Sequence, residues 1–314
     1  MAVPEGGMEY ARWFELSGDT LVVTSPYDGA RDTTVLHECR RLVCMSSSHV
    51  GYLEAIGADS LVAAVSGLGF LSNEAVRSRA AEAGYDSAPD YETIVRLEPD
   101  YVLMYAISSA PTQALMKLRD LGIPVLVLHE HLEPHPLGRA EYVKLFGALA
   151  GCPQKADSVF NAVRDAYLSM TVPEQSVNVL VNIPYGDQWY IPGKDNYLYR
   201  LISDAGGIIL GAEEGVQSSV ISVEKAYTLS READFWLHPG WCTTKAELAS
   251  VHPLFSSFPA FSGEIWNNTS KATPGGGNAF WESGPARPDL ILRDLITIFS
   301  GTLADSLTYY LPVR

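Results

Sequence analysis

The chain has 314 residues, which is enough for two α/β domains that each bury a hydrophobic core. Hydrophobic residues make up 47% of the chain and charged residues 19%, as in an ordinary globular protein. The formal net charge is −15 and no stretch forms a basic stripe, which argues against nucleic acid as a partner and against attraction to an anionic membrane surface.

Neither the cysteines nor the chain start fixes the cellular compartment. The four cysteines form no CxxC pair and no disulfide framework. No run of eighteen or more apolar residues predicts a membrane-spanning helix. The first residues, MAVPEGGMEY, lack the charged and apolar regions of a signal peptide. We therefore expect either a cytosolic protein or a mature domain whose leader lies outside this sequence.

The first half of the chain alternates between strands and helices. Two β-rich runs around Ser17-Gly18-Asp19 predict a hairpin at about residues 8–35. Further strands are predicted at 41–45, 61–65, 101–105 and 123–128, with helices at 49–56, 91–98 and 112–121. This alternation is typical of a parallel sheet that is covered by helices on both faces.

A long amphipathic helix is predicted in the middle of the chain. Gly151-Cys152-Pro153 interrupts the alternation, and the following apolar residues recur at intervals of three and four: Ala156, Val159, Phe160, Val163, Tyr167 and Met170. A helix that ends before Pro173 would span roughly 25 Å at 1.5 Å per residue.

The remaining residues repeat the strand–helix theme. We therefore predict an α/β fold of two Rossmann-like lobes with parallel sheets, joined by a single long helix, with a ligand cleft between the lobes. The boundaries are 1–153 for the N-terminal lobe, 154–172 for the bridging helix and 173–314 for the C-terminal lobe.

Aromatic residues follow several predicted strands. In open parallel sheets, ligands bind beyond the carboxyl ends of the strands. The residues singled out at these ends are His49, Phe70, Tyr105, His129, Trp189, Tyr190, Trp241 and Trp266. Large aromatics on loops suit a cleft that holds a flat or bulky ligand by stacking. The alternative is that each one covers the core of its own lobe.

A metal site is a second hypothesis for the histidine-rich stretch HEHLEPHP. The candidate ligands of a divalent metal are His49, His129, Glu130, His131, Glu133, His135 and His238. The stretch lacks HxxxH or HExxH spacing, and its prolines favour a loop, so we do not assign a metal site. The sequence has no GxSxG, Walker A or HExxH motif, so we expect neither an enzyme nor a bound cofactor.

One unit occurs twice, once in each half. DYETIVRLEPDYVLMY has Glu92 near the start of a short helix that leads into an apolar strand. SVEKAYTLSREADFWL has Glu224 at the matching place, although its helix-to-strand link is longer. A carboxylate near a helix N-terminus also offsets the helix dipole, so local stability is an alternative explanation for both glutamates.

The order of these parts resembles the substrate-binding proteins of ABC importers for iron-siderophores, haem and cobalamin. The likeness covers most of residues 41–300 and rests on both repeated units and on RLVCMSSSHVGYLEAIGADSLVAAVSG, LRDLGIPVLVL, LFGALAGCPQKADSVF, YLYRLISDAGG and ARPDLILRDLITIF. In that family a long helix hinges the lobes, and one glutamate on each lobe docks into an arginine pocket of a membrane subunit. The resemblance implies that Glu92 and Glu224 dock the permease.

The resemblance also implies a function and a location. We expect a monomeric, periplasmic or lipoprotein-tethered binding protein that delivers a ferric siderophore or haem to an ABC importer, with cobalamin as the alternative ligand. The aromatic and histidine residues named above would contact the ligand, and Arg287 would pair with an anionic group on it. The rival functions are free zinc or manganese binding, a cytosolic two-lobed α/β enzyme, and a chelatase-like or nitrogenase-like module.

Overall fold

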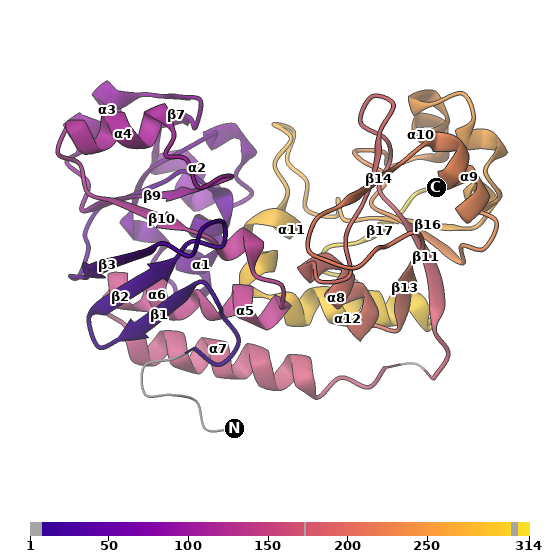
Figure 1. The fold of residues 1–314 in the computed structure, drawn as a ribbon, viewed down its shortest axis with the longest axis horizontal. Helices are drawn as coiled ribbons and strands as arrows, with labels where there is room; N and C mark the ends of the chain where they lie inside the picture. The colour runs from indigo at the N-terminus through magenta and orange to yellow at the C-terminus, as the bar shows by residue number, and fades with distance from the viewer. Residues whose placement is uncertain (1–7, 173, 303–306) are drawn as a thin grey trace. The chain divides into compact units, whose positions relative to one another are not determined.

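The computed structural model describes residues 8–172, 174–302 and 307–314 (Figure 1). The chain divides into two compact units. Unit 1 comprises the chain up to Ala166 together with Ala272–Pro288, and unit 2 comprises Tyr167–Lys271 and Asp289–Arg314. Each unit has its own mainly parallel five-stranded sheet, which confirms the predicted α/β class. The chain start, on which the expectation about a leader rests, lies outside the described residues.

The sheet of unit 1 is entirely parallel, in the order β10-β9-β4-β5-β6. Its strands are β4 (Leu42–Cys44), β5 (Val62–Val65), β6 (Ala81–Glu82), β9 (Tyr101–Tyr105) and β10 (Val125–Leu128). A small hairpin of β7 (Gly84–Tyr85) and β8 (Ala88–Pro89) follows β6. The strands are short apolar runs because helices cover both faces of a parallel sheet.

Helices supply the two apolar layers of unit 1. They are α1 (Ser47–Ala55), α2 (Glu74–Arg79), α3 (Tyr91–Leu97), α4 (Gln113–Asp120), α5 (Pro136–Glu141), α6 (Val143–Leu149) and α11 (Ala279–Glu282). The 3-10 turns are η1 (Asp59–Leu61), η2 (Leu68–Phe70), η3 (Glu130–Leu132) and η6 (Gly284–Ala286). Ile94 of α3 and Leu118 of α4 pack against Val43 and Val102 of the sheet, and all four are buried.

Three antiparallel strands precede this core. They are β1 (Phe14–Ser17), β2 (Thr20–Thr24) and β3 (Arg31–Val35). The first two form the predicted hairpin, in which Gly18 takes the left-handed conformation with φ of 60°. The chain just before β1 is held by carboxylates of unit 1. The Glu133 carboxylate accepts the Arg12 N–H at 2.9 Å, and the Glu141 carboxylate accepts the Tyr10 N–H at 2.7 Å.

Unit 2 has a sheet in the order β13-β11-β15-β16-β17, in which only the last strand is antiparallel. Its sheet strands are β11 (Val177–Val181), β13 (Gly207–Ile209), β15 (Phe235–Leu237), β16 (Glu264–Asn267) and β17 (Leu311–Pro312). Strands β12 (Trp189–Ile191) and β14 (Ser219–Ile221) pair antiparallel in a separate two-stranded sheet. The helical elements are α8 (Tyr197–Asp204), α9 (Val223–Leu229), α10 (Lys245–Val251), η4 (Phe255–Ser257), η5 (Pro259–Ser262) and α12 (Pro288–Phe299).

The long helix predicted in the middle of the chain is α7 (Pro153–Leu168). Ala156, Phe160 and Val163 are buried, which confirms the predicted apolar face of this helix. The division between the units falls at Ala166, so most of the helix belongs to unit 1. None of the helices in the described ranges is long and apolar enough to cross a lipid bilayer.

Residues 272–288 differ from the predicted domain boundaries. The sequence placed them in the C-terminal lobe, whereas the structure groups them with unit 1. The reason is a set of contacts that no local pattern encodes. The Glu282 carboxylate accepts the N–H groups of Ser72 and Asn73 at 2.6 and 2.9 Å. A Cβ atom on Gly51 of α1 would lie 1.9 Å from the Glu282 carbonyl oxygen, so the two backbones touch only because residue 51 is glycine.

We expect Gly51→Ala to lower the free energy of unfolding by about 2 kcal/mol. Alanine gains about 1 kcal/mol of helix propensity over glycine, but overpacking typically costs about 1–3 kcal/mol and here the obstacle is backbone. Denaturant unfolding followed by circular dichroism measures the change. Gly69→Ala is the control, because no atom lies within 4 Å of a Cβ at that position. Equal stability of the two variants would contradict the close approach.

Candidate functional site

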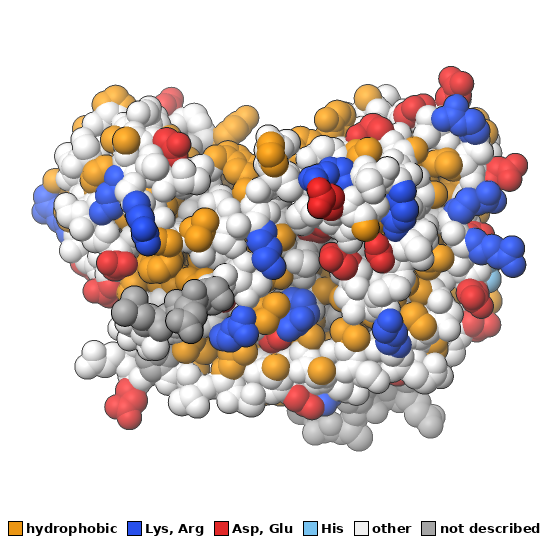
Figure 2. All heavy atoms as spheres, turned by 180° about the vertical axis from the view of Figure 1, so that it is seen from behind, with side chains coloured by type: hydrophobic (Ala, Val, Ile, Leu, Met, Phe, Trp, Pro, Cys, Tyr) orange, Lys and Arg blue, Asp and Glu red, His pale blue; other side chains and the backbone are white. Residues whose placement is uncertain are grey.

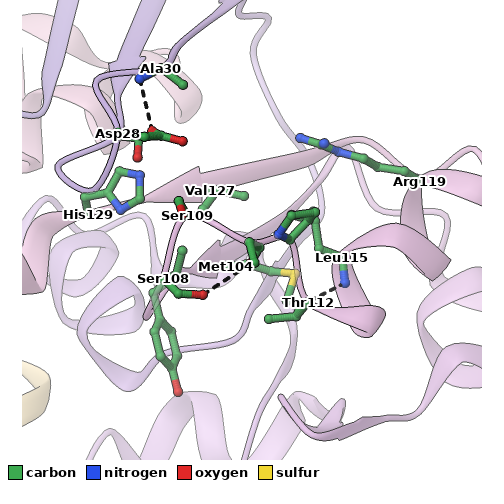
Figure 3. A pocket seen from close by; sticks show the side chains of 15 residues that line it. Asp28, Ala30, Met104, Ser108, Ser109, Thr112, Leu115, Arg119, Val127 and His129 are labelled. Carbon is green, nitrogen blue, oxygen red and sulfur yellow. Dashed lines mark hydrogen bonds between the residues drawn. The ribbon is translucent and has the colours of Figure 1, made fainter.

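The carboxyl ends of β9 and β10 bring two of the predicted site residues together. Leu128 pairs with Tyr105 in the parallel register, so His129 follows immediately beside the end of β9. Tyr105 is half-buried and His129 is only 4% exposed. Both line a cavity of about 260 Å³ (Figure 3). The strand ends of unit 1 therefore form a pocket, as the ligand-binding rule for parallel sheets predicts.

The pocket has three walls, all from unit 1. One is the turn at residues 25–30 between β2 and β3, the second is the pair of strand ends, and the third is the N-terminal part of α4. Thr112 and Leu115 line the third wall, and Arg119 joins them from the last turn of α4. Another cavity, of about 380 Å³, is lined by Asp86, Ile107 and Gln113 and also by Tyr105. The two cavities share Met104, Tyr105 and Thr112 in their linings.

Burial keeps the His129 and Tyr105 side chains neutral. Desolvation lowers the pKa of His129 to about 4, and the neighbouring His131 also lowers it, while Glu130 and Asp28 oppose the shift. Desolvation likewise raises the pKa of Tyr105 to about 12. At neutral pH the pocket therefore presents an uncharged imidazole and a phenol. Both are hydrogen-bonding groups that do not require a charged ligand.

His49 lies in the interior of unit 1 rather than on the pocket wall. Its side chain is fully buried, and its Nε2 is 3.4 Å from Oε1 of Glu130. The Ser48 hydroxyl donates to the same oxygen at 3.0 Å. Burial alone would raise the pKa of Glu130, but the nearby His49, followed by His131 and Arg139, lowers it to about 2. The His49 side chain therefore lies beside Glu130 in the interior and has no exposed surface for a ligand to contact.

Two other candidate metal ligands, His135 and Glu133, accept hydrogen bonds from backbone N–H groups. His135 is the N-cap of α5 and its Nδ1 accepts the Leu137 N–H at 3.0 Å. The Glu133 carboxylate accepts the N–H groups of Arg12 and Trp13. In residues 8–172, 174–302 and 307–314, no three His, Cys, Asp or Glu side chains come close enough to hold a metal ion.

The prediction for Trp189 is corrected by the structure. Trp189 lies in strand β12 and is fully buried. Its ring stacks on Phe258 with centroids 6.1 Å apart, and its Nε1 donates to the Val181 carbonyl at 2.7 Å. Tyr190 and Trp266 also lie in strands, β12 and β16, and not in loops. Trp189 therefore belongs to the core of unit 2. It is part of a buried aromatic cluster that fills the space between β11 and η4-η5.

The other predicted contact residues retain some exposed surface. Trp241 is 61% exposed in the loop after β15, and Tyr190 is 39% exposed. Trp266 is half-buried and donates from Nε1 to Glu264 at 3.2 Å. Phe70 is 44% exposed in η2 and meets Tyr85 edge to face. Arg287 is half-buried directly before α12. Their contact with a ligand stays a prediction.

Glu92 and Glu224 occupy equivalent positions in the two units. Each is the second residue of a seven-residue helix, α3 or α9, and each side chain is exposed. The N-cap side chain accepts the third helical N–H in both cases, at 3.0 Å from Asp90 to Thr93 and at 3.2 Å from Ser222 to Lys225. Each helix leads into a sheet strand, β9 or β15. The repeated unit in the sequence is therefore also a repeated local structure.

His238 predicts a pH dependence for the stability of unit 2. Its side chain is 7% exposed, and its Nε2 is 2.7 Å from the Tyr310 hydroxyl. Burial lowers its pKa to about 4, so the unfolded chain binds the proton more readily between pH 4 and 6.5. We therefore expect the free energy of unfolding to fall by roughly 3 kcal/mol as the pH drops from 6.5 to 4.

The measurement is chemical denaturation at several pH values, with His238→Asn as the comparison. Asparagine does not titrate in this range and tolerates the positive φ of 58° at residue 238. The variant should lose less stability on acidification than the wild type. The same loss in both proteins would show that His238 is not responsible.

Side chains that sequence reasoning missed also line the pocket. Asp28 comes from the turn before β3 and Arg119 from the last turn of α4. They are far apart in the chain, and neither belongs to a recognisable motif. On the face drawn in Figure 2, the described Lys and Arg side chains are scattered among acidic ones and form no continuous basic stripe.

Known proteins resemble the chain over most of its length. An uncharacterized lipoprotein of Methanocaldococcus jannaschii is 25% identical over 275 residues, which are 82% of this chain and 64% of that protein. A cobalamin-binding protein of Halobacterium salinarum is 26% identical over 254 residues, which are 80% of this chain and 66% of that protein. The chain thus spans less than two thirds of the length of either relative.

The fold is also that of a solved structure. The crystal structure of a periplasmic heme binding protein from Pseudomonas aeruginosa superposes with a TM-score of 0.67 at 18% identity, covering 88% of this chain and 98% of that one. A family model described as periplasmic binding protein matches residues 42–262. This match covers more than half of the 314 residues and confirms the resemblance seen in the sequence. The chain belongs to the periplasmic binding protein family.

Proposed function

We propose that this protein captures a metal chelate outside the cytoplasmic membrane and delivers it to an ABC importer. The observation that carries the proposal is the matched pair of exposed glutamates, Glu92 on unit 1 and Glu224 on unit 2. Each sits in the first turn of a capped helix, so its carboxylate has a defined place on the surface. One such group on each unit suits a partner made of two related membrane subunits.

The electrostatics of the chain support docking through these carboxylates. The net charge of −15 attracts a partner with positively charged pockets. Rim charges of this kind steer the encounter and fix the register more than they add affinity. A hydrogen bond from Ser222 lowers the pKa of Glu224, so its carboxylate is ionised at neutral pH. Each interaction is weak enough to be released after transfer of the ligand.

For the ligand, we propose an iron complex, either a ferric siderophore or haem, or alternatively cobalamin. Cobalamin is supported by the named ligand of the Halobacterium salinarum relative, and haem by that of the superposed Pseudomonas aeruginosa protein. Phe70, Tyr190 and Trp241 are partly exposed aromatic side chains that suit the flat or bulky surface of such a complex. The lipoprotein relative supports a periplasmic or membrane-tethered location.

A titration of the purified chain with a panel of haem, cobalamin and ferric siderophores tests the proposal. Tryptophan fluorescence should change on addition of the correct chelate, because the indole of Trp241 is 61% exposed. We expect one compound to bind with a Kd in the micromolar range or below, and Trp241→Phe to reduce the fluorescence change. No binding by any member would reject a chelate as the ligand.

A further inference from the structure

The turn that follows β15 places Trp241 at the surface of unit 2. The Cys242 N–H donates to the Pro239 carbonyl at 3.2 Å, which closes a turn over residues 239–242. Gly240, the second residue of this turn, has a φ of 62°, which glycine adopts without steric cost. Pro239 and Cys242 are buried, whereas Trp241 is 61% exposed. The turn therefore leaves one large aromatic side chain at the surface.

Asn267 lies directly beside this turn because of the pairing between β15 and β16. The parallel register places Leu237 opposite Trp266, and the His238 N–H donates to the Trp266 carbonyl at 3.0 Å. Asn267 is the last residue of β16 and is only 1% exposed. The carboxyl end of one strand thus brings a buried amide next to the loop that leaves the neighbouring strand.

The Asn267 amide holds the backbone on both sides of Trp241. Its Nδ2 donates to the Gly240 carbonyl at 2.9 Å and to the Cys242 carbonyl at 2.8 Å. Its Oδ1 accepts the Asn268 N–H at 3.0 Å. An amide nitrogen has two N–H groups, so both are used on the residues that flank Trp241. The backbone of Trp241 is therefore anchored at both ends.

A second strand end restrains the same turn. A Cβ atom at Gly240 would lie 2.6 Å from Cδ1 of Ile183, which follows β11. In the sheet, β15 lies between β11 and β16, so the turn meets residues from both neighbouring strands. This restraint matters for binding, because ordering a loop on association opposes affinity. A backbone that is ordered before the ligand arrives avoids that loss.

We propose that Asn267 is a positioning residue, whose amide fixes the turn so that the Trp241 indole is presented to the chelate. The inference rests on the proposed function, in which Trp241 contacts the chelate. A flat or bulky ligand stacks best on an aromatic ring whose backbone is already in place. Without the two hydrogen bonds the turn changes its conformation, and the loss of affinity passes through Trp241 alone. Asn267 itself is buried and has almost no surface for a ligand to contact.

Asn267→Asp and Asn267→Ala separate the amide donors from the size of the side chain. Aspartate has nearly the volume of asparagine, but when ionised it has no N–H donor for the two carbonyls. We expect the chain labelled with fluorinated tryptophan to show a shifted fluorine NMR signal for Trp241 in both variants. That signal is identified by its absence from Trp241→Phe, and the signal of Trp13 in unit 1 should not move. An unchanged Trp241 signal in both variants, measured without any chelate, would overturn the proposal.

A double-mutant cycle tests whether Asn267 acts through Trp241. Haem, cobalamin and the ferric Desferal complex are each titrated into the wild-type chain, Asn267→Ala, Trp241→Ala and the variant with both changes. For the compound that binds, Asn267→Ala should weaken affinity at least fivefold in the wild-type background and less than twofold in the Trp241→Ala background. A purely structural role of Asn267 predicts the same loss in both backgrounds, and that result would reject the positioning role.

Gly240→Ala gives a second route to the same result if Asn267→Ala fails to fold. Its methyl group meets the Ile183 side chain and disturbs the turn while the Asn267 amide stays in place. The resulting loss of affinity should disappear in the Trp241→Ala background, and its persistence there would contradict the proposal. Asn161→Ala, at an exposed position of α7, is the control and should bind within twofold of the wild type. If the wild-type chain bound none of the three compounds, the proposed function would fail, and the fluorine signal of Trp241 would still decide whether Asn267 positions it.

Discussion

Replacing Glu92 and Glu224 together by alanine is expected to reduce chelate uptake at least tenfold while leaving chelate affinity unchanged. Each variant removes one of the two carboxylates that we propose to dock the importer, and the single variants should fall between the wild type and the double variant. Both side chains are exposed and neither acts as a helix cap, so the fold is retained. Uptake is measured in cells that lack the chromosomal copy of the gene, and affinity by titration of the purified protein.

The matched control is the pair Glu74→Ala and Glu213→Ala. Glu74 lies in the first turn of α2, as Glu92 lies in the first turn of α3, and Glu213 is an exposed glutamate of unit 2. This pair changes the net charge of each unit by the same amount as the docking variants. It should leave uptake within about twofold of the wild type. Normal uptake by the Glu92 and Glu224 double variant would rule out docking through these residues.

Replacing Trp189 by alanine is expected to lower the free energy of unfolding of unit 2 by about 3–5 kcal/mol, which is typical of a buried aromatic residue. The fully buried indole packs against Trp236, Phe255 and Phe258. Its removal leaves a cavity in this cluster and also removes the hydrogen bond to the Val181 carbonyl. Thermal and denaturant unfolding measure the effect.

Trp241→Ala serves as the comparison for Trp189→Ala. Because Trp241 is 61% exposed, its removal should change stability by less than about 0.5 kcal/mol. If Trp189→Ala were fully stable but no longer bound the chelate, the residue would belong to the ligand site and not to the core.

The parts of the fold that the sequence predicted well have strong local signals. Strand β9 spans residues 101–105, as predicted, and β15 spans residues 235–237 at the end of the second repeated unit. Both are continuous apolar runs, which buried parallel strands require. Helices α3 and α9 begin after Asp90 and Ser222, whose side chains are typical N-caps, and this placed Glu92 and Glu224 correctly in the first helical turn.

The parts that were not predicted depend on contacts between distant residues. Strand β3 has the polar sequence RDTTV and is mostly exposed, so it shows no alternation of apolar residues. The burial of Trp189 and His49 depends on neighbours that are distant in the chain, Phe258 and Glu130 respectively. Asp28 and Arg119 line one cavity only because the 25–30 turn packs beside the end of β9. No short-range pattern marks any of these positions.

Native mass spectrometry of the purified chain after incubation with each compound of the chelate panel tests the central claim most directly. We expect the mass of a single chain to increase by one intact complex, metal and organic part together, for one compound of the panel. The addition of bare metal ions, or no addition with any compound, would contradict the proposal that this periplasmic binding protein carries a metal chelate.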